Sequence, residues 1–243
     1  MLNGGNAGNI ETIVIAARLK MPVVSIDYRM PPKHPAPAAT DDVIAVWKQL
    51  LEEHSPNQMV MGGTSAGGNI TLSSVQRFKE AGLSMPAALY IGTPCVDAAK
   101  TGDSRFINEG IDRSLVAWEN IAADAGVLYA GEYHLDHPHV SPIYGDFSGL
   151  PPTYLISGTR DLMLSDTVRA HRELRRAGVE AHLHIYEGQS HGDYVGVMNA
   201  PESFEHYAEL NAFVLEHLKL PSPISDVSTE PLTDIEIPTS ATY

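Results

Sequence analysis

The sequence is poor in cysteine and in positive charge, and each shortage excludes a class of protein. Its one cysteine, Cys95, cannot form a disulfide within the chain. This fits a reducing compartment, and we expect a cytoplasmic protein. The 243 residues hold 16 Lys and Arg against 30 Asp and Glu, a formal net charge of −14. Because nucleic acids and anionic membranes are bound through clustered cations, we expect neither as a main partner.

Long apolar runs are also absent. No stretch approaches the roughly 18 consecutive apolar residues that a membrane-spanning helix needs, so we expect no membrane span. The first six residues carry no positive charge and no apolar core, which argues against a signal peptide. With 43% hydrophobic and 19% charged residues, the composition is typical of a globular protein with one core, or at most two small domains.

Short β-rich runs alternate with helical stretches along most of the chain. Strands are expected at residues 22–28, 59–61, 87–91, 153–157 and 181–186. Between them, apolar residues at helical spacing indicate helices, with Thr40 capping the first and with Gly82 and Gly178 ending two others. This alternation is typical of an α/β protein with a mostly parallel sheet flanked by helices.

The regular pattern breaks in two places. From about 96 to 141 the sequence predicts no strand and one helix near 115–129, and a connection of that length is typical of an insertion such as a lid. From 221 to 243 the chain is rich in Pro, Ser and Thr, with acidic residues and no Lys or Arg. We therefore expect a core over 1–220 that carries a cap insertion, and a disordered acidic tail over 221–243.

A glycine-rich turn at residues 63–67, Gly-Thr-Ser-Ala-Gly, matches the pattern G-x-S-x-G. It follows an expected strand and opens an expected helix, which is the setting of a nucleophile elbow. Such a turn exposes the hydroxyl of Ser65, and the N–H of Ala66 at the helix start points to where an oxyanion would form. The alternative is a phosphate-binding turn, but this stretch has neither the Gly-Lys-Ser/Thr ending of a Walker A motif nor the G-x-G-x-x-G fingerprint.

A serine hydroxyl needs a histidine base, and the histidine needs a carboxylate to orient it. After an elbow of this kind, the carboxylate and then the histidine follow along the chain. Asp161 comes just after the strand at 153–157, and His191 comes just after the strand at 181–186. Because the carboxyl ends of parallel strands meet at one edge of a sheet, the sequence predicts a triad of Ser65, Asp161 and His191.

Other reactive side chains fit structural roles better. Asp166 competes for the role of the acid, but it falls in the first turn of a helix, further from its strand than Asp161. Cys95 is expected as a small buried residue, and His182 and His184 as the polar face of a strand. We expect no cofactor. We also expect no metal, because the one loop that is rich in possible metal ligands lacks the residue spacing of a zinc site. That loop contains His134, Asp136, His137 and His139.

Four segments together resemble the bacterial hormone-sensitive-lipase family of carboxylesterases, within the α/β-hydrolases. They are DYRMPPKHPAPAA at 27–39, GTSAGGN at 63–69, HVSP through GLPP at 139–152, and GTRDL with HG at 158–162 and 191–192. Matched residue to residue, the resemblance implies Ser65 as nucleophile, Asp161 as acid and His191 as base. It also implies the α/β-hydrolase fold with a partial helical cap, and a small-molecule ester as substrate.

The sequence departs from this family at its start. The family's His-Gly-Gly motif supplies most of the oxyanion hole, and counting back from Asp27 places it before Met1. The Asn-Gly-Gly at 3–5 lies too close to Asp27 to replace it. We therefore expect an N-terminally truncated fold without the first three core strands. The strands at 22–28 and 59–61 would then flank a gap in the sheet, unless they pair directly.

These observations predict a serine carboxylesterase that hydrolyses short-to-medium acyl esters through an acyl-enzyme. One alternative is a catalytically impaired fragment, or a non-catalytic small-molecule binder of the same fold. A second alternative is an amidase or peptidase with the same triad. A dimer like those of the family would use the edge strand at 181–186 and the last helix.

Overall fold

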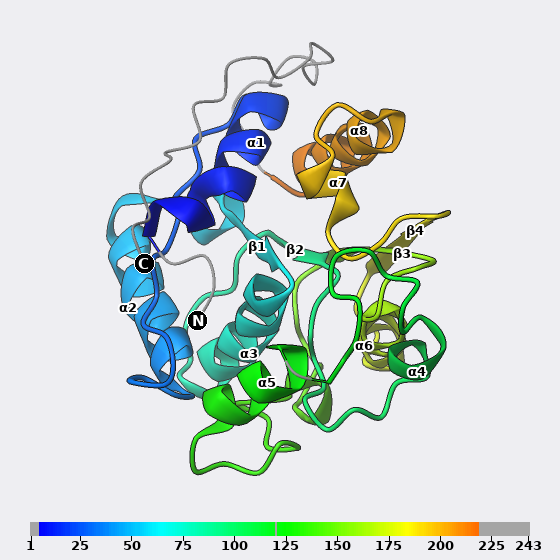
Figure 1. Cartoon of the computed structure of the whole chain (residues 1–243). Helices are drawn as coiled ribbons and strands as arrows, with labels where there is room; N and C mark the ends of the chain where they lie inside the picture. The colour runs from blue at the N-terminus through cyan, green and yellow to red at the C-terminus, as the bar shows by residue number, and fades with distance from the viewer. Residues whose placement is uncertain (1–4, 120, 219–243) are drawn as a thin grey trace.

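A four-stranded parallel sheet forms the centre of the molecule in the computed structural model, which describes residues 5–119 and 121–218 (Figure 1). The strands lie side by side in the order β1-β2-β3-β4, so β1 and β4 are the two edges. Their bounds are β1 Val60–Thr64, β2 Ala88–Gly92, β3 Thr153–Gly158 and β4 Ala181–Tyr186. The parallel α/β architecture predicted from the alternating pattern is therefore confirmed, and so are four of the five expected strands.

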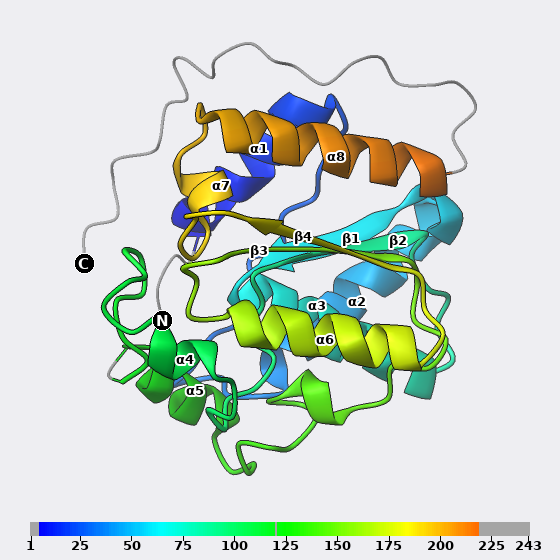
Figure 2. The same ribbon diagram turned by 90° about the vertical axis from the view of Figure 1, so that its right-hand side faces the viewer.

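Helices cover both faces of the sheet (Figure 2). One face carries α1 and α8, with the short α7 beside α8, and the other carries α3 and α6, with α2 packed on α3. The bounds are α1 Ile10–Leu19, α2 Ala38–Glu53, α3 Ala66–Glu80, α6 Leu164–Arg176, α7 Asp193–Gly196 and α8 Pro201–His217. Short 3-10 turns lie at Gly5–Asn9, Pro56–Gln58 and Pro142–Tyr144.

Side chains of the central strands alternate between two apolar cores, one on each face of the sheet. In β2, Leu89 and Ile91 belong to the core under α3 and α6, whereas Ala88 and Tyr90 belong to the core under α8. All four are at most 4% exposed. Burying a large apolar side chain contributes about 1.5–3 kcal/mol, so the two central strands anchor both layers of helices.

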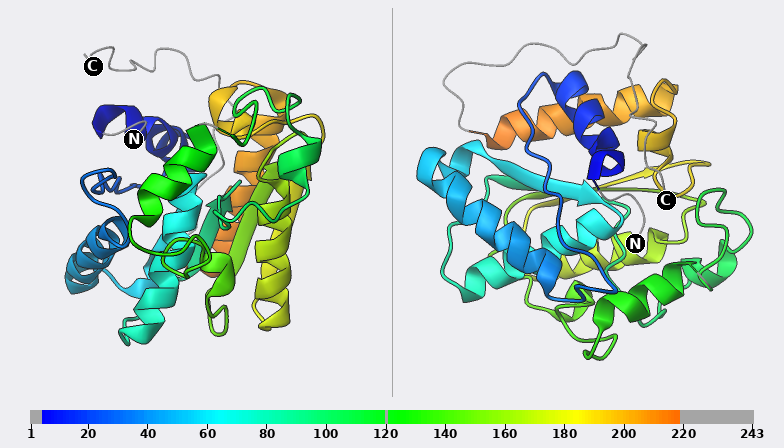
Figure 3. Two further views of the ribbon diagram at one scale, coloured as in Figure 1. Left: turned by 60° about the horizontal axis from the view of Figure 1, so that its bottom comes forward. Right: turned by 60° about the vertical axis from the view of Figure 1, so that its left-hand side comes forward.

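The segment at 22–28 was predicted as a strand, and this prediction is wrong. The chain from Met21 to Met30 forms no strand and pairs with neither β1 nor any other described strand (Figure 3). Val23 and Val24 are 39% and 61% exposed, while Ile26 and Tyr28 still pack on the core. An apolar run becomes a strand only where a neighbour can accept its backbone hydrogen bonds, and here it forms the connection between α1 and α2.

Two expected helix starts also need correction. The helix α2 begins at Ala38, so Thr40 lies inside it and donates its hydroxyl to the carbonyl of Pro37 at 2.8 Å instead of capping the helix. The helix predicted near 115–129 begins later, as α5 at Ile121–Ala130. The helix α1 was not predicted from the sequence, and it begins after Asn9 without a side-chain hydrogen bond at its cap.

The insertion at 96–141 contains two helices and no strand among its described residues. They are α4 Ser104–Ile107 and α5. Both lie beyond the layer of α3 and α6, next to the carboxyl ends of the strands (Figure 2). Its role as a cap stays a prediction, and the tail at 221–243 lies outside the described residues. Within the part of the chain that is described, no helix is long and apolar enough to cross a membrane.

Candidate active site

Ser65 occupies the sharp turn between β1 and α3, in a backbone conformation that side chains rarely adopt. Its φ and ψ are 59° and −116°, and it stands as the N-cap of α3. The turn is possible because strand and helix nearly touch: a Cβ on Gly63 would lie 3.0 Å from the backbone of Gly67. The N–H of Ser65 donates to the carbonyl of Gly92 in β2 at 2.8 Å, which ties the turn to the next strand. A positive φ at a serine is strain that the surrounding structure must hold, as a nucleophile elbow requires.

Ser65, His191 and Asp161 form a continuous chain of hydrogen bonds. His191 Nε2 lies 2.9 Å from Ser65 Oγ, and His191 Nδ1 lies 3.0 Å from Asp161 Oδ1. Each residue follows the carboxyl end of a different strand, β1 for Ser65, β3 for Asp161 and β4 for His191. The structure therefore brings together the three residues that the sequence selected, in the geometry in which a histidine can take a proton from a serine.

The carboxylate of Asp161 is fully buried and held by several donors. Oδ1 accepts the N–H of Met163 at 2.7 Å, in addition to its contact with His191. Oδ2 accepts the hydroxyl of Ser157 at 2.8 Å and the hydroxyl of Thr93. Thr93 also lies 3.2 Å from His191 Nδ1 and has a positive φ of 33°. Neither Ser157 nor Thr93 was identified from the sequence, because a single hydroxyl in or after a strand gives no signal of its own.

The pKa of His191 is raised above the ordinary histidine value. Burial acts most strongly and opposes the charged ring, but it is outweighed by the charge of Asp161, by its hydrogen bond and by the more distant Asp112 and Asp193. The charged form of the ring is therefore stabilised next to Ser65 Oγ.

A free backbone donor lies at the start of α3, next to Ser65. Ala66 is the first residue of α3, so its N–H has no acceptor within the helix, and the residue is exposed. The positive end of the helix dipole adds to this donor. The sequence contains no His-Gly-Gly triplet.

Asp166, the competing acid, lies elsewhere. Its carboxylate is fully buried and pairs with the equally buried guanidinium of Arg105 in α4 at 2.5 Å. Burial raises the pKa of Asp166 to about 7, although the charge of Arg105 opposes that shift. Arg105 also stacks on the ring of Trp118 at 3.7 Å. Asp166 therefore joins the insertion to α6 and does not contact His191.

The remaining reactive side chains have other neighbours. Cys95 was expected to be a small buried residue and is partly buried, and this burial raises the pKa of its thiol to about 12. His137 and His139 stack with each other, their ring centres 4.8 Å apart. His184 pairs with Glu209 at 2.9 Å. Across residues 5–119 and 121–218, no group of three or more His, Cys, Asp or Glu is arranged to hold a metal ion.

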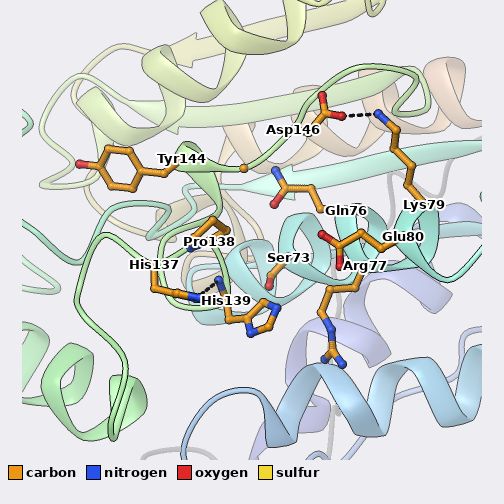
Figure 4. A pocket seen from close by; sticks show the side chains of 11 residues that line it. Ser73, Gln76, Arg77, Lys79, Glu80, His137, Pro138, His139, Tyr144 and Asp146 are labelled. Atoms are coloured by element: carbon orange, nitrogen blue, oxygen red, sulfur yellow. Dashed lines mark hydrogen bonds and ion pairs between the residues drawn. The ribbon is translucent and has the colours of Figure 1, made fainter.

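A hollow of about 760 Å³ lies along α3 (Figure 4), and none of Ser65, Asp161 and His191 lines it. Its two cations are already paired, Arg77 with Asp41 at 2.7 Å and Lys79 with Asp146. The other lining residues are Ser73, Gln76, Glu80, His137, Pro138, His139, Tyr144 and Gly145. Because both cations are paired within the chain, we assign no anionic ligand to this hollow.

The elbow after β1, with the carboxylate after β3 and the histidine after β4, is the arrangement of the α/β-hydrolase class. The family model described as alpha/beta hydrolase fold matches residues 9–195. The chain belongs to this family, and it is similar to esterases of the bacterial hormone-sensitive lipase family.

Relatives of this chain carry esterase names. An esterase of Acinetobacter venetianus is 31% identical over 175 residues, which is 72% of this chain and 57% of that protein. The crystal structure of esterase E25 has a TM-score of 0.87 and 54% identity, over 89% of this chain and 66% of that one. An esterase from the bacterial hormone-sensitive lipase family has a TM-score of 0.83 and 27% identity, over 89% and 75% of the two chains. The present chain thus spans less than two thirds of the first two relatives.

Proposed function

We propose that this chain is a serine carboxylesterase that hydrolyses short-to-medium acyl esters without a cofactor. The observation that carries the proposal is the hydrogen-bonded series Ser65–His191–Asp161, with distances of 2.9 and 3.0 Å. The esterase names of the relatives, including one acetyl-hydrolase of Streptomyces hygroscopicus, support ester substrates with small acyl groups.

The reaction would proceed in two halves. In the first, His191 Nε2 accepts the proton of Ser65 Oγ while Oγ attacks the ester carbonyl carbon. The N–H of Ala66 donates to the oxyanion, and the collapse of the tetrahedral intermediate expels the alcohol, which takes the proton from His191. In the second half, His191 activates water, and water releases the acid from Ser65. Asp161 holds the ring in the orientation that serves both proton transfers.

A catalytically impaired or purely binding protein is the second candidate, because the start of α3 offers one backbone donor for an oxyanion, the N–H of Ala66. Each lost oxyanion donor costs roughly 10²–10³ in rate, so an assembled triad can still give slow turnover. This candidate predicts a folded protein in which Ser65 is present but weakly reactive.

Hydrolysis of p-nitrophenyl acetate and butyrate tests the proposal. The purified chain is compared with Ser65→Ala, which removes only the hydroxyl. We expect hydrolysis that disappears in the variant, together with labelling of Ser65 by a fluorophosphonate. A folded chain that neither hydrolyses the esters nor takes the label would overturn the esterase and leave the binding protein.

We also propose that two copies pair through β4 and α8. The support is that β4 is an edge of the sheet, with Ile185 37% exposed. An unpaired edge strand is a template for a second strand, and a symmetric pair uses the same edge on both copies.

A further inference from the structure

A carboxylate lies behind the nucleophile elbow, on an element that no catalytic motif contains. Glu11 is in the first turn of α1, and its Oε2 accepts the N–H of Thr64 at 3.3 Å. Its Oε1 accepts the hydroxyl of the same threonine. Thr64 is the last residue of the edge strand β1 and directly precedes Ser65. Glu11 therefore binds the residue next to the nucleophile through both backbone and side chain.

Two tyrosines complete a hydroxyl cluster around this contact. Tyr90 in β2 donates to Glu11 Oε1 at 3.2 Å and lies 3.1 Å from Thr64 Oγ1. Tyr194 in α7 lies 3.2 Å from the same Thr64 oxygen. The cluster fills the space beside Gly92, where a Cβ would collide with the hydroxyls of Tyr194 and Thr64. The carbonyl of Gly92 accepts the N–H of Ser65 at 2.8 Å. The cluster therefore contacts both Thr64, the residue before the nucleophile, and Gly92, its backbone hydrogen-bond partner.

Ser65 needs such support because its φ of 59° is strained. A strained residue keeps its conformation only where its neighbours fix the backbone on both sides. On the helix side, the carbonyl of Ser65 accepts the N–H of Asn69 at 3.2 Å. On the strand side, β1 is the sheet's edge, and the N–H of Thr64 is met by Glu11 in place of a neighbouring strand.

We propose that Glu11 is a positioning residue for the nucleophile: it holds Thr64 so that Ser65 presents its Oγ to His191. The inference rests on the proposed esterase function and deepens it, because it assigns a role to α1 in a reaction whose three principal groups lie on other elements. Glu11 does not contact the reacting atoms. It acts through Thr64, and a displacement of the nucleophile by about 1 Å can cost on the order of 10²-fold in rate.

Substitutions that distinguish the positioning of Thr64 from a general contribution to folding test the proposal. Glu11→Leu removes both acceptors, whereas Glu11→Gln keeps an oxygen for the Thr64 N–H. Glu53→Leu, at the exposed end of α2, is the matched control. Each is measured for kcat and KM on p-nitrophenyl butyrate, for the rate of fluorophosphonate labelling, and for hydrogen exchange of peptides covering 60–68 and 153–158.

We expect Glu11→Leu to lower kcat and the labelling rate by about 10- to 100-fold, with KM within about twofold. Exchange in 60–68 should accelerate while 153–158 stays protected, and Glu11→Gln should stay within about threefold of the parent. A folded Glu11→Leu protein with unchanged kcat, labelling and exchange would overturn the proposal. So would a loss of kcat that only follows the folded fraction.

Two further results keep the test decisive. If Glu11→Leu does not fold, Thr64→Val removes the hydroxyl contact with Glu11 and should lower kcat in the same direction, although the backbone N–H contact remains. Thr64→Ser keeps both contacts and should behave like the parent. If the parent protein takes no fluorophosphonate, the esterase proposal fails by itself. Exchange in 60–68 then decides on Glu11: faster exchange in the leucine variant supports the positioning role, and unchanged exchange refutes it.

Discussion

At the scale of single residues, the proposed mechanism makes the reactivity of Ser65 depend on the protonation of His191. The pKa of His191 is raised because Asp161 and other nearby carboxylates outweigh the effect of burial. Only the neutral ring can accept a proton from Ser65, so labelling of Ser65 should rise with pH through a midpoint above the ordinary histidine value of 6.5. Protonation of His191 also stabilises the folded state, and this contribution to the free energy of unfolding is lost as pH rises through the same midpoint. A pH profile of the fluorophosphonate labelling rate checks this.

Asp161→Asn is the control for that profile. Without the carboxylate, the midpoint should move to lower pH, and the maximal rate should fall by on the order of 10⁴-fold because the ring loses its orienting partner. A midpoint that stays where it was would show that Asp161 does not set the protonation of His191.

Glu11 should destabilise the fold at neutral pH. Burial raises its pKa above 4.5, although the hydrogen bonds from Thr64 and Tyr90 oppose this. The folded state therefore holds the proton more tightly than the unfolded state, and stability falls as pH rises from below 4.5 through the raised value. The variant Glu11→Gln has no carboxyl group at this position to titrate in this pH range. Its thermal unfolding midpoint should therefore rise relative to that of the parent as pH increases. A difference that is constant or shrinks between pH 4 and pH 8 contradicts the raised pKa.

The sequence selected Ser65, Asp161 and His191 because each stands beside a local signal, an elbow motif or a strand end. The residues that hold them carry no such signal. Thr93 contacts Asp161 across 68 positions, and Glu11 contacts Thr64 across 53. Contacts of this range depend on how strands and helices assemble, which no pattern within a window of the sequence contains.

At the scale of elements, the strands predicted correctly are those with a partner. The central β2 and β3 are apolar on both faces and pair on both edges, so pattern and structure agree. The run at 22–28 has a similar composition but no neighbouring strand among the described residues, and it forms no regular secondary structure. The pattern describes how a segment can be buried, while strand formation also needs a hydrogen-bonding partner elsewhere in the chain.

The buried pair of Arg105 and Asp166 should be the main attachment of α4 to α6. Both side chains are fully buried, and Arg105→Met leaves the carboxylate without its partner. We expect a loss of about 3–5 kcal/mol in the free energy of unfolding at pH 8, measured by urea denaturation. The pKa of Asp166 is about 7 even with Arg105 present, so the loss should shrink at pH 5, where the carboxyl is neutral.

The double variant Arg105→Met with Asp166→Leu separates charge from packing. Replacing both members of a buried ion pair by apolar groups is often neutral, so this protein should regain most of the lost stability at pH 8. If the double variant is as unstable as Arg105→Met, the stacking of Arg105 on Trp118 is the stronger contribution.

At the scale of the whole molecule, the two edges of the sheet differ in how they are protected. The edge at β1 is met by Glu11 and flanked by the connection from α1 to α2 (Figure 3). At the β4 edge, Ile185 is exposed, and a shallow groove of about 380 Å³ runs beside the strand, with Glu205 and Glu209 of α8 in its wall. An edge with an exposed apolar residue favours pairing with a second copy, whereas a lysine on an edge strand opposes it.

Light scattering at micromolar concentration should therefore give twice the chain mass of 26.3 kDa. Ile185→Lys should shift the mass to that of one chain, because two lysines would face each other across the symmetric pair. Val127→Lys places the same charge on α5, where the parent side chain is 58% exposed, and should leave the mass unchanged. A monomeric parent protein would reject the dimer, and a dimer that survives Ile185→Lys would move the interface away from β4. Because the triad lies at the carboxyl ends of the strands and not along the β4 edge, the monomeric variant should keep the labelling of Ser65.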